Sequence, residues 1–274
     1  MSDQPHRGGI SLKDFTLASH GSESAAYISA LEKFDQIAQL QELKALGRER
    51  TGIGPAARVL DVGCGFGLET LRLARLASPG GFVSGCDLSS DFLAEARRRA
   101  EAERANIAFE QARVEALPYP DRSFGTVWSE RLLVYVPDVR QAVSEMRRVL
   151  CPGGHISSIE PDISTSTLNL KNRSLVRRVM GHEADTNVVH GWLPGQLHAI
   201  LESVGFNNIQ LATRVLVFAQ DLAASYFAQC GHSAAVDGLI SESELLDWTS
   251  GIEALFHDGK LFATVGYFLF TAKA

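Results

Sequence analysis

Three glycines at alternate positions follow an apolar segment in the run Val59-Leu60-Asp61-Val62-Gly63-Cys64-Gly65-Phe66-Gly67. Glycine lets a backbone turn sharply and lie against a ligand without a Cβ in the way. Asp61 stands two places before the first glycine, where its carboxylate can hold an ammonium group directly or through water. We therefore predict a cofactor-binding turn. Its predicted contacts are Asp61, Gly63, Cys64, Gly65, Phe66 and Gly67.

The spacing of the glycines separates two classes of cofactor. Dinucleotide-binding turns follow the pattern Gly-x-Gly-x-x-Gly and seat a pyrophosphate on the N-terminus of the next helix. Here the third glycine comes one residue early, and the carboxylate of Asp61 would repel a pyrophosphate. S-adenosylmethionine has an amino-acid end and an adenosine end, and it fits both features better than NAD. Asp87, twenty positions beyond Gly67, can accept hydrogen bonds from both ribose hydroxyls and suits either cofactor.

The elements that must position these residues alternate between strands and helices. Strand patterns cover residues 58–62, 82–87, 107–111, 126–129, 155–160, 208–218 and 262–271, and helical patterns include 68–77, 89–105, 138–150 and 194–204. Strands separated by helices form βαβ units and a parallel sheet. We predict an α/β fold, Rossmann-like, with a seven-stranded, mostly parallel sheet, helices on both faces and a helical lid.

The chain divides into three parts by composition. Residues 1–22 are rich in Gly, Ser and charge and are expected to form a flexible N-terminus, and residues 23–50 carry apolar side chains at helical spacing, as lid helices would. The remaining part, residues 51–274, is expected to form the main domain, with helical insertions around 161–191 and 219–257. Extra helices between the last strands of an open sheet tend to cover its carboxyl edge, so we expect these insertions to form a substrate cap.

Composition limits the partners. The chain has 274 residues, 45% of them hydrophobic, and a net charge of −6, which argues for a soluble protein and against binding to nucleic acid. No segment approaches a membrane span. The four cysteines show no metal-binding or redox spacing, which favours reduced thiols and a cytoplasmic location. We expect no metal, and the apolar N-terminal helices suit either a homodimer or a lid.

Residues 58–162 resemble the class I S-adenosylmethionine-dependent methyltransferases, in particular the ubiquinone/menaquinone-biosynthesis type that methylates small molecules. Four blocks carry the resemblance in order: the glycine run 59–67, Gly85-Cys86-Asp87-Leu88-Ser89, the block Glu115-Ala116-Leu117-Pro118-Tyr119-Pro120-Asp121-Arg122-Ser123-Phe124, and Glu145-Met146-Arg147-Arg148-Val149-Leu150-Cys151-Pro152-Gly153-Gly154.

The resemblance implies further cofactor contacts. Leu88 would press on the adenine face, and Arg113 and Val114 fall where the family contacts the adenine edge, although the family often has Asp or Asn at the first of these positions. Ser129 matches a contact near the methionine end. Tyr27 on the first expected helix is placed to close over the sulfonium, because aromatic faces attract cations.

Methyl transfer needs little acid–base chemistry from the protein. The sulfonium is already an activated donor, so alignment of the acceptor supplies much of the rate, and a base helps only if the acceptor starts protonated. Candidates near the carboxyl edge of the sheet are Glu130, Arg131, Tyr135, Glu160 and Asp162. We predict catalytic roles for Tyr135, where relatives often carry His, and for His182. The predicted substrate-pocket residues are Arg131, Asp162, His190 and Trp192.

The sequence thus predicts methyl transfer to carbon, oxygen or nitrogen of a small acceptor, either aromatic and quinone-like or a secondary metabolite. The first alternative is a protein of the same fold with another activity, such as a cyclase that uses the cofactor structurally. The second is an NAD-dependent dehydrogenase, which the glycine spacing disfavours.

Overall fold

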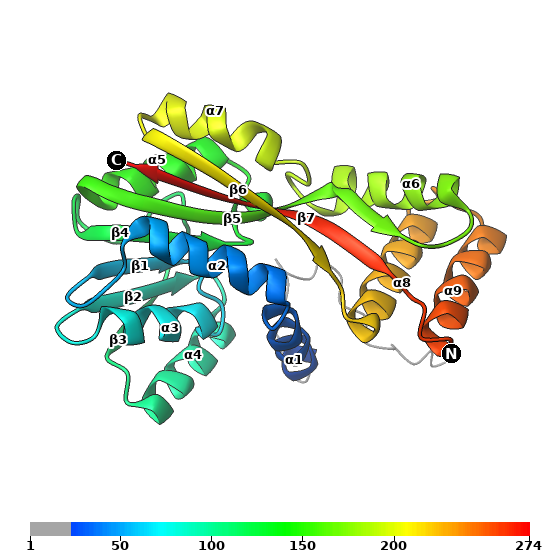
Figure 1. Cartoon of the computed structure of the whole chain (residues 1–274), viewed down its shortest axis with the longest axis horizontal. Helices are drawn as coiled ribbons and strands as arrows, with labels where there is room; N and C mark the ends of the chain where they lie inside the picture. Colours follow the sequence, from blue (N-terminus) through cyan, green and yellow to red (C-terminus); the bar gives the residue numbers. More distant parts are fainter. Residues whose placement is uncertain (1–22) are drawn as a thin grey trace.

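The computed structural model of the chain describes residues 23–274, so the predicted flexible segment 1–22 lies outside the described residues. One seven-stranded sheet runs in the order β3-β2-β1-β4-β5-β7-β6 (Figure 1). Its strands are β1 (Arg58–Val62), β2 (Phe82–Asp87), β3 (Ile107–Gln111), β4 (Phe124–Glu130), β5 (Leu150–Leu168), β6 (Asn207–Val217) and β7 (Ala263–Lys273). The pairs from β3 to β5 are parallel, and β7 is antiparallel to β5 and β6. The predicted mostly parallel α/β sheet is confirmed.

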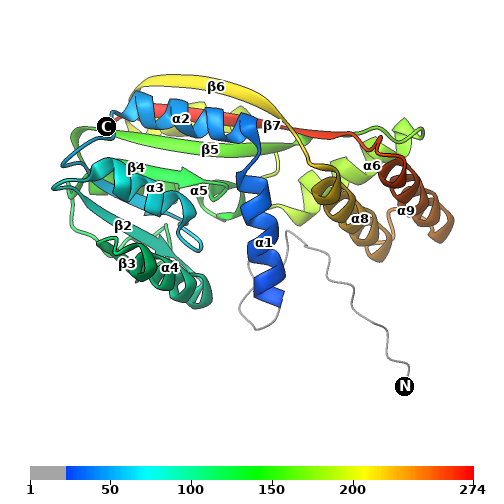
Figure 2. The same ribbon diagram turned by 60° about the horizontal axis from the view of Figure 1, so that its bottom comes forward.

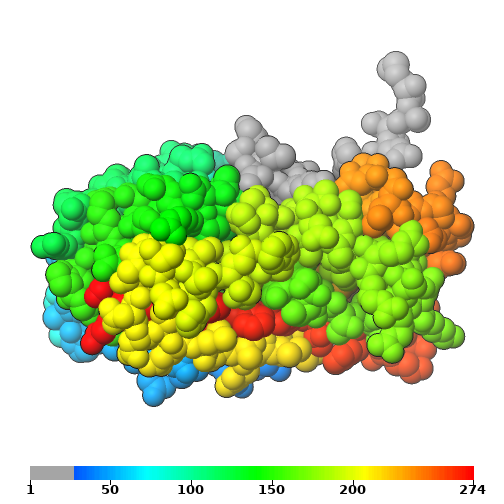
Figure 3. Space-filling model, turned by 90° about the horizontal axis from the view of Figure 1, so that it is seen from above, coloured from blue at the N-terminus to red at the C-terminus, as the bar shows by residue number. Residues whose placement is uncertain are grey.

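Helices cover both faces of this sheet, also as predicted. The helices nearest the sheet are α2 (Ala38–Thr51), α3 (Leu68–Ala77), α4 (Ser90–Glu103), α5 (Val139–Val149) and α7 (Pro194–Val204). Apolar side chains of α2 and α3 pack with β1 and β7 in one core, and those of α5 and α7 pack on the opposite face in a second core. Seen from above in Figure 3, the yellow residues of α7 and β6 lie at the surface on this side of the molecule.

A helical lobe surrounds the far ends of β5 and β7 (Figure 1). It consists of α6 (Arg173–His182), η3 (Glu183–Asn187), α8 (Gln220–Val236) and α9 (Glu242–His257). Helices α6, α8 and α9 share one apolar core, whereas Ala184 of η3 packs in the core that contains α5 and α7. The strand predicted for residues 155–160 is longer than expected, because β5 continues to Leu168, which pairs with Ala263 and is buried in the lobe. Helix α6 begins after this strand, at Arg173. The side chain of Asn172 caps it by accepting a hydrogen bond from the backbone N–H of Leu175.

The two N-terminal helices contact different parts of the molecule. The second, α2, buries Leu40 and Leu43 completely against the sheet. The first, α1 (Glu23–Asp35), stands beside α8 in Figure 2, and Lys33 forms an ion pair with Asp221 at 2.6 Å. Thus α1 connects the sheet to the helical lobe.

Candidate active site

A pocket of about 280 Å³ opens at the carboxyl ends of β1, β2 and β4. Strand order reverses between β1 and β4, which is where open α/β sheets bind their ligands. The predicted site residues that line this pocket are Asp61, Gly63, Cys64, Gly65, Phe66, Asp87, Leu88, Arg113, Val114, Arg131 and Tyr135. The structure therefore brings most of the predicted cofactor residues together around one pocket.

The glycine turn and Asp87 form a single hydrogen-bonded unit. The backbone of Gly63, Gly65 and Gly67 has positive φ (+70°, +52° and +84°), which residues with a Cβ rarely adopt. The N–H of Gly65 donates to one carboxylate oxygen of Asp87 at 2.9 Å, and the N–H of Ser89 donates to the other at 2.9 Å. An ionised carboxylate accepts about four hydrogen bonds, so Asp87 retains acceptor capacity for a ligand.

Asp61 lies deeper, beneath the glycine turn. Its side chain is 3% exposed, and its carboxylate accepts a hydrogen bond from the hydroxyl of Thr70 at 2.6 Å. Burial raises the pKa of Asp61 to about 7, although the Thr70 hydrogen bond lowers it. A cation bound beside this carboxylate would favour its ionised form.

The pocket has an apolar edge at the end of β2. Leu88 is 57% exposed there, and the buried Val114 lines the same pocket. Arg113 forms an ion pair with Glu115 at 3.2 Å. A flat ring resting on Leu88 would cover the exposed apolar surface.

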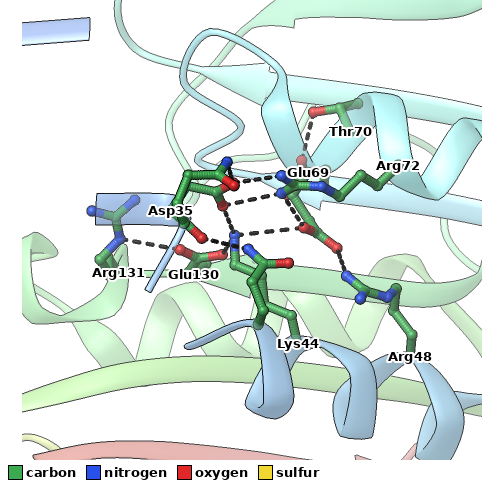
Figure 4. Close-up of polar contacts among 11 residues, drawn as sticks. Asp35, Lys44, Arg48, Glu69, Thr70, Arg72, Glu130 and Arg131 are labelled. Atoms are coloured by element: carbon green, nitrogen blue, oxygen red, sulfur yellow. Dashed lines mark hydrogen bonds and ion pairs between the residues drawn. The ribbon is translucent and has the colours of Figure 1, made fainter. Parts of the chain in front are cut away.

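Lys44 on α2 is the centre of a buried ion cluster (Figure 4). Its Nζ lies 2.5 Å from an oxygen of Asp35, 2.6 Å from one of Glu130 and 3.5 Å from one of Glu69. Burial alone would raise the pKa of Asp35, but Arg72 and Lys44 hold it at about 2. Burial lowers the pKa of Lys44, and the three carboxylates outweigh this effect and raise it. The cluster therefore holds ionised groups from α1, α2, α3 and β4 against one wall of the pocket.

The buried ion cluster was not predicted from the sequence, although the sequence contains a signal for it. Lys44 falls on the apolar face of α2, one residue after Leu43 and one helical turn after Leu40. Charged side chains are seldom buried unless they are paired. A lysine within an apolar helical stripe therefore predicts buried carboxylates opposite it.

Arg131 joins this cluster at the end of β4. Its Nε lies 3.2 Å from Glu130, and its guanidinium lies 4.8 Å from the centre of the Phe34 ring on α1. The backbone of Arg131 is left-handed, with φ of +51°, and its N–H donates to the carbonyl of Ile159. Such strained positions cluster at ligand sites, which agrees with its location at the pocket.

Glu160 fixes the short helix η2 (Leu133–Tyr135) that carries Tyr135 to the pocket. Its carboxylate is fully buried and accepts hydrogen bonds from the N–H groups of Leu133 at 3.1 Å and Val134 at 3.4 Å. Burial raises the pKa of Glu160 to about 7, although these hydrogen bonds lower it.

The raised pKa of Glu160 makes stability depend on pH. The folded carboxyl keeps a proton that the unfolded chain releases above its ordinary pKa of 4.5, so the free energy of unfolding should fall as pH rises from 4.5 to about 7 and then level off. The amide of Glu160→Gln does not titrate, so the free energy of unfolding of this variant should decline less with pH. Urea unfolding at pH 5, 6, 7 and 8 measures this decline. Glu253→Gln, at an exposed site on α9, should keep the wild-type slope. A Glu160→Gln slope equal to that of the wild type would contradict this assignment.

Three other predicted cofactor residues are not among those that line the pocket. Gly67 begins α3 and faces Ala96. Ser129 is fully buried, and its hydroxyl donates to that of Ser158 at 3.0 Å. Tyr27 lies on α1, and its side chain is outside the described part of the structure. Their cofactor roles stay predictions.

Four predicted catalytic or substrate residues are also not among those that line this pocket. His182 contacts Asp237 at 2.9 Å within the helical lobe. Asp162 accepts hydrogen bonds from the backbone and hydroxyl of Ser164. His190 lies against the loop of Pro137, and the side chain of Trp192 is 52% exposed. None of these placements tests the predicted roles.

Two kinds of feature are absent from the described residues. Within residues 23–274, no group of three or more His, Cys, Asp or Glu side chains is arranged to hold a metal ion. No helix in that same range is long and apolar enough to cross a membrane.

Part of the chain is similar to known methyltransferases. Residues 59–154 match the family model of a methyltransferase domain. The ubiquinone/menaquinone biosynthesis C-methyltransferase of Hahella chejuensis is 39% identical over 114 residues, 41% of this chain and 46% of that protein. The 2-phytyl-1,4-naphtoquinone methyltransferase of a Nostoc species is 34% identical over 142 residues, 46% of this chain and 62% of that protein. The matched region spans about half the length of these relatives.

A solved structure supports the same fold. A Haemonchus contortus phosphoethanolamine N-methyltransferase, determined with S-adenosylhomocysteine, superposes with a TM-score of 0.62 at 18% identity, covering 96% of this chain and 60% of that one. Over the matched residues the chain is thus similar to the class I S-adenosylmethionine-dependent methyltransferases, the class whose cofactor is S-adenosylmethionine.

Proposed function

We propose that the protein transfers a methyl group from S-adenosylmethionine to a small-molecule acceptor, aromatic or quinone-like. The observation that carries the proposal is the pocket in which Asp61, the glycine turn and Asp87 lie side by side. The two relatives named for quinone substrates favour this acceptor class for our chain as well.

The residues present fit the cofactor from end to end. Asp87 would accept from the ribose hydroxyls, the exposed side chain of Leu88 would cover the adenine, and Asp61 would face the ammonium group. The backbone of Gly65 has no atom within 4 Å of where a Cβ would stand, which leaves open space beside the turn. The positive φ of Gly65 favours glycine at the turn, and the open space beside it leaves room for a ligand between the two carboxylates.

The proposed chemistry depends mainly on alignment. The bound cofactor supplies an activated methyl group on a sulfonium. The protein has to exclude water and place the acceptor atom in line with the methyl carbon. Tyr135 lines the pocket and is our proposed residue for orienting the acceptor, and Arg131 lies on the same wall. We retain His182, Asp162, His190 and Trp192 as proposed contacts of an acceptor held under the helical cap.

Binding of the cofactor product should release protons near pH 7. Asp61 has a pKa of about 7 in the free protein, so a sizeable fraction is protonated there, and an ammonium group beside it would favour ionisation. Titration calorimetry with S-adenosylhomocysteine in buffers of different ionisation enthalpy should show release of roughly half a proton per site. Asp61→Asn should abolish the buffer dependence. Equal proton release from this variant would assign the effect to another group.

Turnover of the donor tests the proposed function directly. The purified chain is incubated with S-adenosylmethionine and a hydroxylated aromatic probe such as 1,4-dihydroxynaphthalene, and S-adenosylhomocysteine is measured by mass spectrometry. We expect product that depends on both protein and probe, and no product from Asp87→Ala. Binding of S-adenosylmethionine without consumption across a panel of hydroxylated aromatics would favour the cyclase-like alternative.

We also propose a cytoplasmic location. All four cysteines are free thiols in the structure, and Cys64, Cys86 and Cys230 are buried. Buried unpaired thiols are typical of proteins from reducing compartments.

A further inference from the structure

Strand β6 is the outermost strand at one side of the sheet, and it is exposed along most of its length. It stands last in the strand order, and no strand within residues 23–274 pairs with its outer edge. Every residue of β6 except Ile209, Ala212 and Leu216 is exposed. Proteins usually protect such an edge with charged side chains, proline or a covering segment, because its unpaired N–H and C=O groups can pair with another strand.

The backbone groups at this edge belong to alternate residues. In an antiparallel pair, the N–H and C=O of one residue point to the neighbouring strand and those of the next residue point away. The N–H of Phe218 donates to the carbonyl of Ala263 on β7, so the even-numbered residues before it face β7. In agreement, the guanidinium of Arg214 donates to the outward carbonyl of Thr213 at 2.9 Å. We call the outward-facing residues the β6 edge: Leu211, Thr213, Val215 and Val217.

The side chains of the β6 edge carry no charge, and three of the four are apolar. Ala212 and Leu216 pack on the side of α2, so the alternating side chains of the β6 edge lie on the opposite face of the sheet. There Leu211, Val215 and Val217 are 52%, 60% and 40% exposed. Figure 3 shows residues of β6 (yellow) and β7 (red) at the surface on this side. Apolar side chains and unpaired backbone groups are therefore exposed together.

We propose that β6 pairs antiparallel with β6 of a second copy of this chain, around a two-fold axis that places the two Thr213 residues opposite each other. The outward N–H and C=O groups of both strands then bond to each other. Each Leu211 lies opposite Val215 of the other copy. Because a two-fold axis brings the same surface of both copies together, the β6 edge has to complement itself, and these apolar pairs allow it to do so.

The position of Arg214 selects this register. A centre at Arg214 would place the two arginines directly opposite each other, and like charges in that position are destabilising. A centre at Val215 would pair fewer residues, and a centre at Ala212 would oppose regular strand to the irregular segment 207–210. Thr213 is the central position that avoids all three problems.

The charges at the junction are balanced in the same register. Arg214 is the one charged residue of β6, and it forms an ion pair with Glu42 of α2 at 2.8 Å. Opposite it stands Ala212 of the second copy. Two arginines therefore meet together with their two glutamates, so no charge enters the junction without a counter-ion. This neutrality favours a second copy over a strongly charged partner.

Sedimentation velocity between about 1 and 100 µM tests the association, which depends on the concentration of the chain. The wild type should reach twice the mass of the chain within this range. Val215→Lys should weaken the dimer by at least about 30-fold, because both copies lose the burial of a valine. Leu246→Lys, at a side chain 67% exposed on α9, should match the wild type.

Thr213→Cys tests the register. Residues directly opposite each other in a hydrogen-bonded pair have Cα atoms about 5.5 Å apart, which a disulfide can span. Mild oxidation should therefore cross-link Thr213→Cys into a covalent dimer. Ser250→Cys, at an exposed position on α9, and the wild type, with its partly exposed Cys151, should stay uncross-linked under the same conditions.

A wild type that stays monomeric up to the highest concentration overturns the inference. A monomer whose segment 207–217 is protected from hydrogen exchange overturns it as well, since another segment of the same chain would then cover the edge. A dimer that Val215→Lys leaves intact uses another surface, and a dimer that Thr213→Cys does not cross-link uses another register. Both results contradict the proposed pairing. Circular dichroism melting reports whether each variant is folded, and none of these measurements involves the cofactor.

Discussion

Asp87→Ala should weaken binding of S-adenosylhomocysteine by at least about 100-fold, as measured by titration calorimetry. Two ribose hydroxyls donating to one carboxylate are charge-assisted hydrogen bonds, each worth about 1.5–3 kcal/mol. Removal of the carboxylate also leaves the N–H of Gly65 without its partner, which loosens the glycine turn. The loss therefore combines missing ligand contacts with a less ordered site.

Two further variants separate these contributions. Asp87→Asn keeps an oxygen that can accept from the backbone but lacks the charge, so its affinity should fall between those of the wild type and Asp87→Ala. Asp91→Ala, four residues on and exposed at the start of α4, should bind within a few-fold of the wild type. Equal binding by Asp87→Ala and the wild type would remove Asp87 from the cofactor site.

Lys44→Met should destabilise the protein by about 3–5 kcal/mol, the usual cost of breaking a buried ion pair on one side. The methionine fits the volume of the lysine stem but removes the buried ammonium between Asp35 and Glu130, which keep only the arginine partners Arg72 and Arg131. Part of the destabilisation should be relieved by lowering the pH, because the remaining carboxylates can then take up protons. Urea unfolding at pH 7 and pH 5 measures both effects.

A matched lysine provides the control. Lys33 on α1 is 59% exposed and forms a surface ion pair with Asp221, so Lys33→Met should change stability by less than about 1 kcal/mol. The Lys44→Met variant should also bind S-adenosylhomocysteine more weakly, since its partners line the pocket. If Lys44→Met is as stable as Lys33→Met, the buried cluster does not hold the N-terminal helices in place.

Local sequence patterns predicted much of the fold. The glycine turn and the helix at residues 68–77 match the structure, and Ser89 caps α4 as its position indicates. Each of these features depends on neighbours within a few residues. The extension of β5 to Leu168 was not predicted, because it depends on pairing with Ala263, far away in the chain.

The site residues also divide into those that a local pattern predicts and those that depend on a distant partner. Asp61 and Asp87 follow directly from strand ends and glycine spacing, and both line the pocket. Lys44 and Glu130 are 2.6 Å apart in space but distant in sequence, so no local pattern pairs them. The contact between Glu183 on η3 and Tyr226 on α8 likewise forms only when the lobe folds. Long-range electrostatic partners are set by tertiary packing, which sequence spacing does not reveal.

The most direct test of the account is a calorimetric comparison of two ligands on the unmodified chain. The early third glycine and the buried Asp61 predict that S-adenosylhomocysteine binds at one site per chain, with a dissociation constant in the micromolar range, and that NADH under the same conditions gives no binding heat. Tight binding of NADH without binding of S-adenosylhomocysteine would contradict the central claim.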